Sequence, residues 1–516
     1  MLDLAIINGK IIDGTGSPRY RADLGVKAGR IVAIGREVGE AEQVIDARDQ
    51  VVAPGFIDIH THSDAALVAD PRGQSAVQQG VTTHVIGNCG YTVFPIVEAA
   101  RRVLGRFGLE PTWTDLRGYA SRLQEQGLGL NVMPLLGHGT IRAAVMGDAD
   151  RPPNPPELAK MKQLVADGMA AGAVGMSSGL IYPPGSFARL SELVELSRVV
   201  AEYDGLYTSH IRGEGKGLVA AVQEAIKVGE QAGLPVQVSH HKAVGRDSWG
   251  LVNETLPLMD QARRRGVNVT WDQYPYLATS TRLSVFVPKW AHDGGNAGLL
   301  ARLSDAAERR RILDELEQMN RNWADVMISF APKNRAWQGQ RLTEIAESLQ
   351  LSAAETLLYI LAAEETNADM VYFGMSEADV ITVMRHPITM IASDGLAVAT
   401  DGPTCAVRQH PRSYGTFPRV LGRYVREKGV LTLEEAIRKM TSAPAQRLGL
   451  PDRGRLQAGL WADITIFDPE QVTDRATFTD PHQYPEGIGW VLVNGEVVVE
   501  RQQHRGRLPG RVLLKS

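Results

Sequence analysis

Short apolar segments alternate with amphipathic stretches of helical period through the middle of the chain. The apolar segments are rich in β-branched residues and favour strands, whereas the stretches near 157–170 and 217–232 have the spacing of helices. Strands that alternate with helices are typical of a parallel α/β protein. Eight such strands predict a (β/α)8 TIM-like barrel, and they lie at 54–64, 82–90, 131–139, 173–178, 206–210, 235–241, 268–274 and 389–395.

Both ends of the chain carry short apolar strands separated by turn residues. Asn8-Gly9 and Asn494-Gly495 each stand between two apolar runs, which is a pattern typical of β-hairpins. We expect residues 1–54 and 450–516 to form one small β-sandwich domain, with a barrel of residues 55–449 inserted between them. Two unrelated flaps, one from each terminus, are the alternative.

Residues from about 281 to 370 interrupt the alternation between the seventh and the eighth predicted strand. This region is long, charged and rich in helix-forming residues, so we expect an inserted subdomain. Active sites of (β/α)8 barrels lie at the carboxyl ends of the strands, where such a subdomain could cover them.

Composition excludes several classes of protein. The 516 residues carry a net charge of -4 without a long basic run, which argues against nucleic acid as a partner. No apolar run approaches the roughly 18–20 residues of a membrane span, and the N-terminus lacks the pattern of a signal peptide. The chain has only 2 cysteines, so no disulfide framework is expected. We expect a cytoplasmic protein with no membrane partner.

The first predicted barrel strand ends in a pair of histidines, His60 and His62. Side chains at positions i and i+2 share one face of a strand, so Asp58, His60 and His62 are predicted to point one way and the intervening isoleucines the other. Two imidazoles on one face form half of a metal site. A buried histidine pair or a surface turn is the alternative for this stretch alone.

Further potential metal ligands follow at the ends of other predicted strands. Imidazole, thiolate and carboxylate groups together favour Zn²⁺. The alternative is a set of polar side chains at the mouth of the barrel that hydrogen-bond to one another without a metal. The candidate ligands are His60, His62, Cys89, His210, either His240 or His241, and Asp394.

Several motifs resemble the amidohydrolase superfamily, and within it the N-acyl-D-amino-acid deacylase (D-aminoacylase) branch. The resemblance runs almost end to end, and the Asn88-Cys89-Gly90 element is specific to this branch. The other motifs are the Pro54–His62 run, Gly137–Arg142, Gly175–Leu180, Ser209–Gly215, Ser239–Lys242, Tyr274–Tyr276, Ser393–Gly395, His410–Arg412, Gly415–Pro418, Thr441–Ala445 and Gly459–Asp463.

The resemblance implies two zinc positions that share the thiolate of Cys89. The tight position would take Cys89, His210 and His240, and the weaker one His60, His62, Asp394 and Cys89. The fourth predicted strand and the two residues after it, 173–180, have neither the Lys nor the Glu that bridges metals in many amidohydrolases, which also favours Cys89 as the bridge. The alternation of polarity along 236–241 mildly favours His241 as the inward residue, whereas the resemblance favours His240.

The resemblance also implies roles for residues around the metal. Zinc would lower the pKa of a bound water and polarise the scissile carbonyl, while Asp394 would act as the general base and then as the acid. Four side chains would hold the α-carboxylate of the substrate, namely Lys242, Tyr274, Ser280 and Arg412.

We therefore expect a zinc-dependent amide hydrolase that removes the acyl group from N-acyl-D-amino acids, giving a carboxylate and a free D-amino acid. Hydrolysis of a dipeptide with a C-terminal D-residue, of a cyclic amide or of another amide is the first alternative, and an inactive binding protein is a remote one. Residues 182–185 and Phe286 could form an apolar pocket that favours hydrophobic side chains. The oligomeric state stays open.

Overall fold

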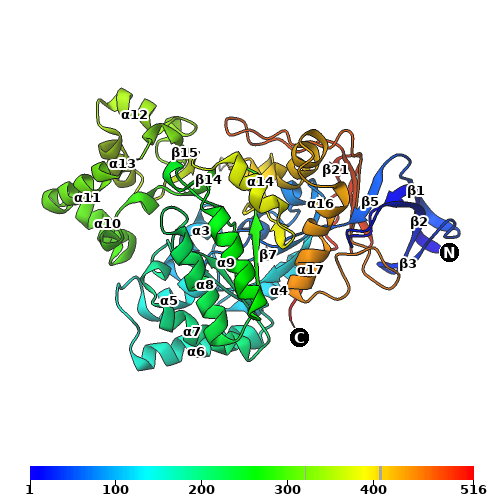
Figure 1. The fold of residues 1–516 in the computed structure, drawn as a ribbon, viewed down its shortest axis with the longest axis horizontal. Coiled ribbons are helices and arrows are strands. Elements are labelled where there is room, and N and C mark those ends of the chain that lie inside the picture. Colours follow the sequence, from blue (N-terminus) through cyan, green and yellow to red (C-terminus); the bar gives the residue numbers. More distant parts are fainter. Residues whose placement is uncertain (320, 406–408, 516) are drawn as a thin grey trace.

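The computed structural model describes residues 1–319, 321–405 and 409–515 (Figure 1). Residues 320, 406–408 and 516, which fall within the predicted inserted subdomain, the barrel and the β-domain, lie outside the described part. No helix among the described residues is both long and apolar enough to cross a membrane.

The parallel strands at the centre form the predicted (β/α)8 barrel. One sheet has the order β6-β7-β8, and the other has the order β17-β13-β12-β11-β10-β9. The strands β8 and β9 are consecutive and together make the third barrel strand, interrupted at Leu135, so they join the two sheets. Asp394 N donates to His60 O at 2.9 Å on the other side, which closes the ring. The strands are β6 (Phe56–Asp58), β7 (Val81–Ile86), β8 (Asn131–Pro134), β9 (Leu136–Gly137), β10 (Gly175–Gly179), β11 (Leu206–His210), β12 (Val236–Val238), β13 (Val269–Gln273) and β17 (Thr389–Ile391).

Helices surround the barrel strands, and both helices predicted from periodicity are present. In α6 (Pro155–Ala170), the side chain of Asn154 caps the first turn and Glu157 bonds back to the backbone of Asn154. The helix α8 (Leu218–Ala232) ends at a left-handed Gly233. The others are α1 (Ala66–Ala69), α2 (Gln74–Val77), α3 (Glu98–Gly105), α4 (Leu116–Gln126), α5 (His138–Met146), α7 (Leu190–Ala201), α9 (Val252–Arg264), α14 (Glu377–Arg385), α15 (Arg412–Arg419), α16 (Leu433–Met440) and α17 (Ser442–Leu448).

Strands from both termini join in one sheet, which lies beside the barrel at the right of Figure 1. Its order is β21-β20-β19-β18-β5-β1-β2-β3, with β4 also paired to β1, so the two ends of the chain are not separate flaps. The strands are β1 (Leu2–Ile11), β2 (Tyr20–Lys27), β3 (Arg30–Gly35), β4 (Ala41–Asp46), β5 (Val51–Pro54), β18 (Ile464–Phe467), β19 (Ile488–Val493), β20 (Glu496–Glu500) and β21 (Gln503–His504).

Only one of the two predicted Asn-Gly hairpins forms. Asn494-Gly495 turns between β19 and β20, with φ of 50° and 85°. The hairpin expected at Asn8-Gly9 is wrong, because β1 continues through it and the pairing with β2 shifts register there. Asn8 also has a positive φ of 63°, but it makes a β-bulge, and β1 beyond it pairs with Val51 and Val52 of β5.

The C-terminal tail leaves this sheet and returns to the barrel. Val132 of β8 donates its N–H to Arg511 O at 2.9 Å and accepts a hydrogen bond from Leu513 N at 2.7 Å. Lys515 N bonds to Gly172 O. Residues 511–515, within the range 450–516 expected to lie in the β-domain, therefore lie on the barrel instead.

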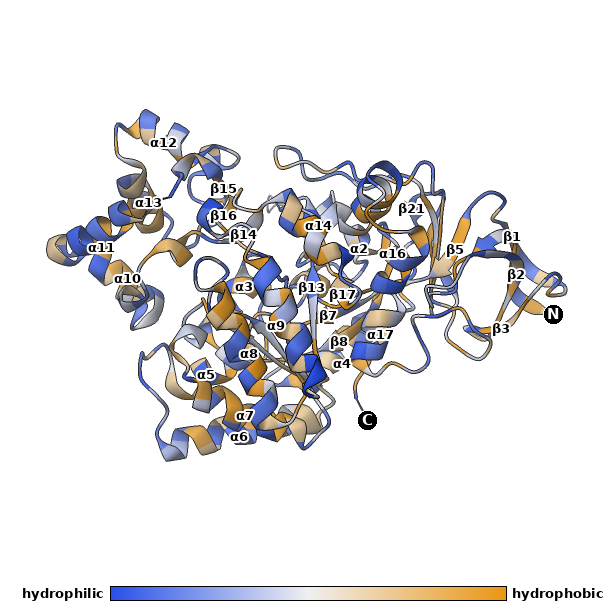
Figure 2. Cartoon of the chain, viewed as in Figure 1, coloured by the Kyte–Doolittle hydropathy of each residue, from blue (hydrophilic) through white to orange (hydrophobic). Residues whose placement is uncertain are grey.

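The insertion between β13 and β17 has a hydrophobic core of its own and lies at the upper left of Figure 1. It also contains a three-stranded antiparallel sheet, β14-β16-β15, which the charged, helix-rich sequence did not predict. Figure 2 shows how hydropathy varies along the chain: the helix α11 (Ala306–Gln318) of the insertion is largely hydrophilic, whereas the strand β5 in the sheet of the two termini is hydrophobic. The remaining elements are α10 (Gly295–Ser304), α12 (Leu342–Leu349), α13 (Ala353–Ala363), β14 (Thr279–Arg282), β15 (Val326–Phe330) and β16 (Asp369–Tyr372).

The turn at Gly495 tests the contact between the two terminal segments. A Cβ at Gly495 would lie 2.4 Å from Gly29 Cα, in the turn between β2 and β3. We expect Gly495→Ala to lower the free energy of unfolding by about 3 kcal/mol, from backbone strain plus crowding. Gly39 has a similar φ of 92° with nothing within 4 Å of its Cβ position, so Gly39→Ala is the control and should cost less. Equal shifts of the urea midpoint for both variants would contradict this close packing.

Candidate metal centre

The candidate ligands converge at the carboxyl ends of the barrel strands. Cys89 follows β7, His240 follows β12 and Asp394 follows β17, each just beyond the last residue of its strand. All three have positive φ, at 53°, 35° and 51°. Positive φ is uncommon for residues other than glycine and often marks functional sites. These turns direct the three side chains away from the strand course and toward one another.

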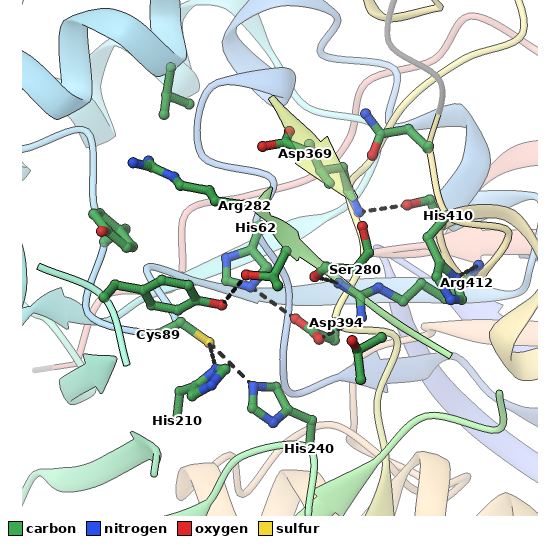
Figure 3. Close-up of a pocket in the computed structure, with 18 of the residues that line it drawn as sticks. His62, Cys89, His210, His240, Ser280, Arg282, Asp369, Asp394, His410 and Arg412 are labelled. Atoms are coloured by element: carbon green, nitrogen blue, oxygen red, sulfur yellow. Dashed lines mark hydrogen bonds and ion pairs between the residues drawn. The ribbon is translucent and has the colours of Figure 1, made fainter. Parts of the chain in front are cut away.

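Cys89 lies among three imidazoles. Its Sγ is 3.3 Å from His60 Nε2, 3.6 Å from His210 Nδ1 and 3.5 Å from His240 Nε2, and Figure 3 shows the last two contacts. Zinc bonds of about 2.3 Å to sulfur and about 2.0–2.1 Å to nitrogen, at tetrahedral angles, place ligand atoms roughly 3.5 Å apart. The spacing of Cys89, His210 and His240 therefore fits one tetrahedral ion.

A second group shares Cys89 with the first. His62 Nε2 lies 2.9 Å from Asp394 Oδ1, and His60 Nε2 lies 3.5 Å from the same oxygen. The donor atoms of His60, His62, Cys89 and Asp394 all lie within 4.8 Å of one another. The structure thus brings together the two donor sets with a common thiol that the family resemblance implied.

Each of the three imidazoles around Cys89 turns its other ring nitrogen toward a carboxylate. His240 Nδ1 lies 3.0 Å and His210 Nε2 3.9 Å from Glu214 Oε1, and His60 Nδ1 lies 3.4 Å from Asp272 Oδ1. Carboxylates in this position fix the tautomer and orientation of metal-binding histidines. Sequence reasoning missed both carboxylates, although Glu214 lies within the Ser209–Gly215 motif and Asp272 within the seventh strand.

The structure places His240, and not His241, beside Cys89. The strand β12 ends at Val238, so the alternation of faces that favoured His241 no longer holds two residues later. His240 N bonds to Asp272 Oδ1 at 2.8 Å, which fixes the turn. His241 points instead to α9, where its Nε2 lies 2.9 Å from Thr255 Oγ1.

Electrostatics favour ionised ligands. Burial alone would raise the pKa of Cys89, but the charge of His60 and contacts with His210 and His240 hold it well below its usual value. Burial would also raise the pKa of Asp394, yet it lies well below the ordinary range because Arg412 Nη1 is 2.7 Å from Asp394 Oδ2. A thiolate and a carboxylate are the forms that bind a metal cation.

The four residues expected to hold the α-carboxylate of the substrate all line one cavity of about 250 Å³ beside these ligands, and they are Lys242, Tyr274, Ser280 and Arg412. Tyr274 has a buried hydroxyl without a hydrogen-bond partner in the described part of the chain, and Arg412 Nη2 lies 3.4 Å from Ser280 O. Lys242 is already engaged, because its Nζ lies 2.5 Å from Glu214 Oε1 and 2.8 Å from His240 Nδ1. Lys242 therefore belongs as much to the support of His240 as to the cavity.

The apolar pocket expected from Tyr182 and Phe286 forms only in part. Tyr182 lines the cavity and its hydroxyl bonds to Thr281 Oγ1 at 2.8 Å. Phe286 is outside the cavity lining and packs in the core of the inserted subdomain against Tyr372. Residues of that subdomain, among them Arg282, line the cavity instead.

Comparisons with known proteins agree with this geometry. The chain is 39% identical over its whole length to an N-acyl-D-glutamate deacylase of Alcaligenes xylosoxydans xylosoxydans, of which the match covers 97%, and 37% identical to a D-aminoacylase of the same organism, of which it covers 98%. The crystal structure of an N-acyl-D-glutamate deacylase from Bordetella bronchiseptica, in complex with zinc and a phosphonate inhibitor, matches with a TM-score of 0.86 and 39% identity, over 99% of both chains. Residues 43–499 match the model of the amidohydrolase family, and the chain belongs to that family.

Proposed function

We propose that this protein is a zinc-dependent hydrolase that converts N-acyl-D-amino acids into a carboxylate and a free D-amino acid. The observation that carries the proposal is the Cys89 thiol among three imidazole nitrogens, with Asp394 and Arg412 at the edge of the same cavity. Full-length relatives named as N-acyl-D-glutamate deacylase, D-aminoacylase and N-acyl-D-aspartate deacylase support it.

The donor set of the site fits zinc in both chemistry and spacing. We assign a tight position to Cys89, His210 and His240, and a weaker one to His60, His62 and Asp394 with the shared thiolate. The buried nitrogen atoms His60 Nδ1 and His210 Nε2 make no hydrogen bond in the described part of the chain and face Asp272 and Glu214 at 3.4 and 3.9 Å, so these carboxylates act on the two rings mainly through charge. Zinc bound there would lower the pKa of a coordinated water and polarise the scissile carbonyl.

Asp394 is the group best placed to move protons. It would take a proton from the attacking water at a carboxylate oxygen and then give that proton to the leaving nitrogen. Its Oδ2 is paired with Arg412 in this structure. A substrate α-carboxylate that pairs with Arg412 would compete with Asp394 for the guanidinium, and this competition would make Asp394 a stronger base when substrate is bound.

The α-carboxylate of the substrate would lie at the end of the cavity formed by Arg412, Tyr274 and Ser280. The free Tyr274 hydroxyl supplies a donor, and Arg412 supplies a charged, bidentate one. The guanidinium of Arg412 also lies 5.0 Å from the centre of the Tyr274 ring, which orients both groups. Lys242 would add positive charge from behind, held by its ion pair with Glu214.

We also propose the cytoplasm as the location, because a thiolate ligand such as Cys89 persists best in a reducing compartment. The division into a barrel of residues 55–449 with an inserted subdomain and a β-domain from both termini stays our proposal, with the tail after residue 508 assigned to the barrel. A small N-acyl amino acid is the partner proposed for the cavity.

The two adjacent histidines provide a matched test of the metal ligands. We expect His240→Asn to lose the tight zinc, because it removes one of three donors around that ion, and His241→Asn to keep it. Zinc content after dialysis, measured by mass spectrometry, checks this. Loss of zinc from the His241 variant alone would reverse the assignment.

Glu214 is predicted to act by positioning His240. Glu214→Gln should weaken zinc binding by about 10- to 100-fold, because the amide accepts a hydrogen bond from His240 Nδ1 less strongly than the carboxylate. Competition with a chelator measures this affinity. Glu224→Gln is the control, since Glu224 pairs with Arg212 outside the cavity lining and should leave zinc binding unchanged.

Hydrolysis of paired N-acetyl-D- and N-acetyl-L-amino acids tests the proposed reaction. We expect turnover of the D-substrates, and a decrease of kcat by about 100- to 10,000-fold in Asp394→Asn protein that keeps its tight zinc. Turnover of neither enantiomer would refute the deacylase proposal. An Asp394 variant with unchanged kcat would refute the proton-transfer role alone.

A further inference from the structure

The cavity continues past the metal ligands to an end built partly by the inserted subdomain. There it is lined by Tyr91, by α3 and by Arg282 of β14. Two tyrosines form the wall between the ends: the Tyr182 ring lies 5.0 Å from the His210 ring and 5.7 Å from the Tyr91 ring, centre to centre. The guanidinium of Arg282 lies 5.2 Å from the centre of the Tyr91 ring. One aromatic wall thus leads from the metal ligands to Arg282.

Arg282 is the charge at this end without a close partner. Its neighbour across the sheet is Asp369, but Asp369 pairs with Arg106 at 2.8 Å. Arg102 pairs with Glu98 at 3.0 Å. Within the described part of the chain, no carboxylate oxygen lies within 4.0 Å of the Arg282 guanidinium, and Asp148 and Asp369 act on it only from farther away.

Arg282 and Arg412 occupy opposite ends of the site. Figure 3 shows Arg282 to the left and Arg412 to the right of His62 and Asp394. Arg412 is the group assigned to the α-carboxylate. A substrate that fills the cavity between them therefore meets a second guanidinium, and a molecule with two carboxylates is complementary to both ends.

We infer that the preferred substrates carry an acidic side chain, as in N-acyl-D-glutamate or N-acyl-D-aspartate, and that Arg282 binds the side-chain carboxylate. This inference rests on the proposed deacylase function. Filling the cavity displaces water from Arg282, and a buried guanidinium without an anion is costly. An apolar side chain would leave Arg282 in that state, whereas a carboxylate would pair with it. The expectation of a pocket for hydrophobic side chains is thus replaced.

The first measurement compares kcat/KM for N-acetyl-D-glutamate, N-acetyl-D-aspartate and N-acetyl-D-methionine. The wild-type enzyme should prefer an acidic substrate over the methionine derivative. Arg282→Leu should lower kcat/KM for the preferred acidic substrate on the order of 100-fold, since it removes one partner of a desolvated charge pair. The same variant should keep or raise kcat/KM for N-acetyl-D-methionine. If Arg282 had only a structural role, the substitution would lower kcat/KM for all substrates together.

Two further variants make the result specific. Arg282→Lys should recover part of the activity toward the acidic substrate, because it keeps a positive charge at the same place. Arg311→Leu is the matched control, since Arg311 lies on α11 over Trp290, outside the cavity lining, and it should leave the substrate ranking unchanged.

Several outcomes would overturn the inference. Preference of the wild type for N-acetyl-D-methionine, or an equal loss for all substrates in Arg282→Leu, would refute it while the deacylase proposal stands. N-succinyl-D-methionine places a second carboxylate on the acyl group instead. If Arg282→Leu impairs only this substrate, Arg282 recognises the acyl group and the inference is wrong. No turnover of any D-substrate would refute both proposals.

Discussion

The hydrogen bond from Asp394 N to His60 O is the interaction on which the site depends. It closes the barrel between its first and last strands, and a second bond from His62 N to Gly395 O continues the same pairing. Three of the four residues whose backbone atoms complete the ring, Asp394, His60 and His62, are therefore candidate ligands. Because closure fixes the distance between these segments, the imidazoles and the carboxylate meet only in the complete barrel, and formation of the fold and of the site cannot be separated.

Buried charge explains the layers around the ligands. Thiolate and carboxylates are costly to bury without partners, and imidazoles need their second nitrogen satisfied. At His240 the structure meets both needs with alternating groups, in which Cys89 contacts His240, His240 contacts Glu214, and Glu214 contacts Lys242. Arg412 balances Asp394 in the same way on the other side. Each group holds the next, so removing one polar residue behind the ligands would change the positions of several.

Regular patterns predicted the fold well, and irregular turns limited the prediction. The eight apolar segments were enough to predict the barrel, because apolar residues mark the positions that are buried in its strands. The hairpin predicted at Asn8-Gly9 was wrong because a residue with positive φ occurs in β-bulges as well as in hairpin turns. The pairing of β1 with β5 decides between the two. The alternation of side chains between the two faces of a strand favoured His241 instead of His240, because the strand ends at Val238 and the alternation does not continue beyond it. Glu214 was missed because its role depends on contacts across the barrel.

The metal ligands and Arg282 come from different parts of the chain. Barrel strands and the loops that follow them hold the metal ligands, so a change there alters the chemistry itself. The strand β14 belongs to the inserted sheet, and Arg282 reaches the cavity from it. A residue on that sheet can change without moving Cys89 or Asp394, whose positions are set by barrel closure. With Arg282 in the role inferred for it, this separation gives a physical reason why one metal centre can serve enzymes with different side-chain preferences: the insertion would select the side chain, and the barrel would hold the metal ligands.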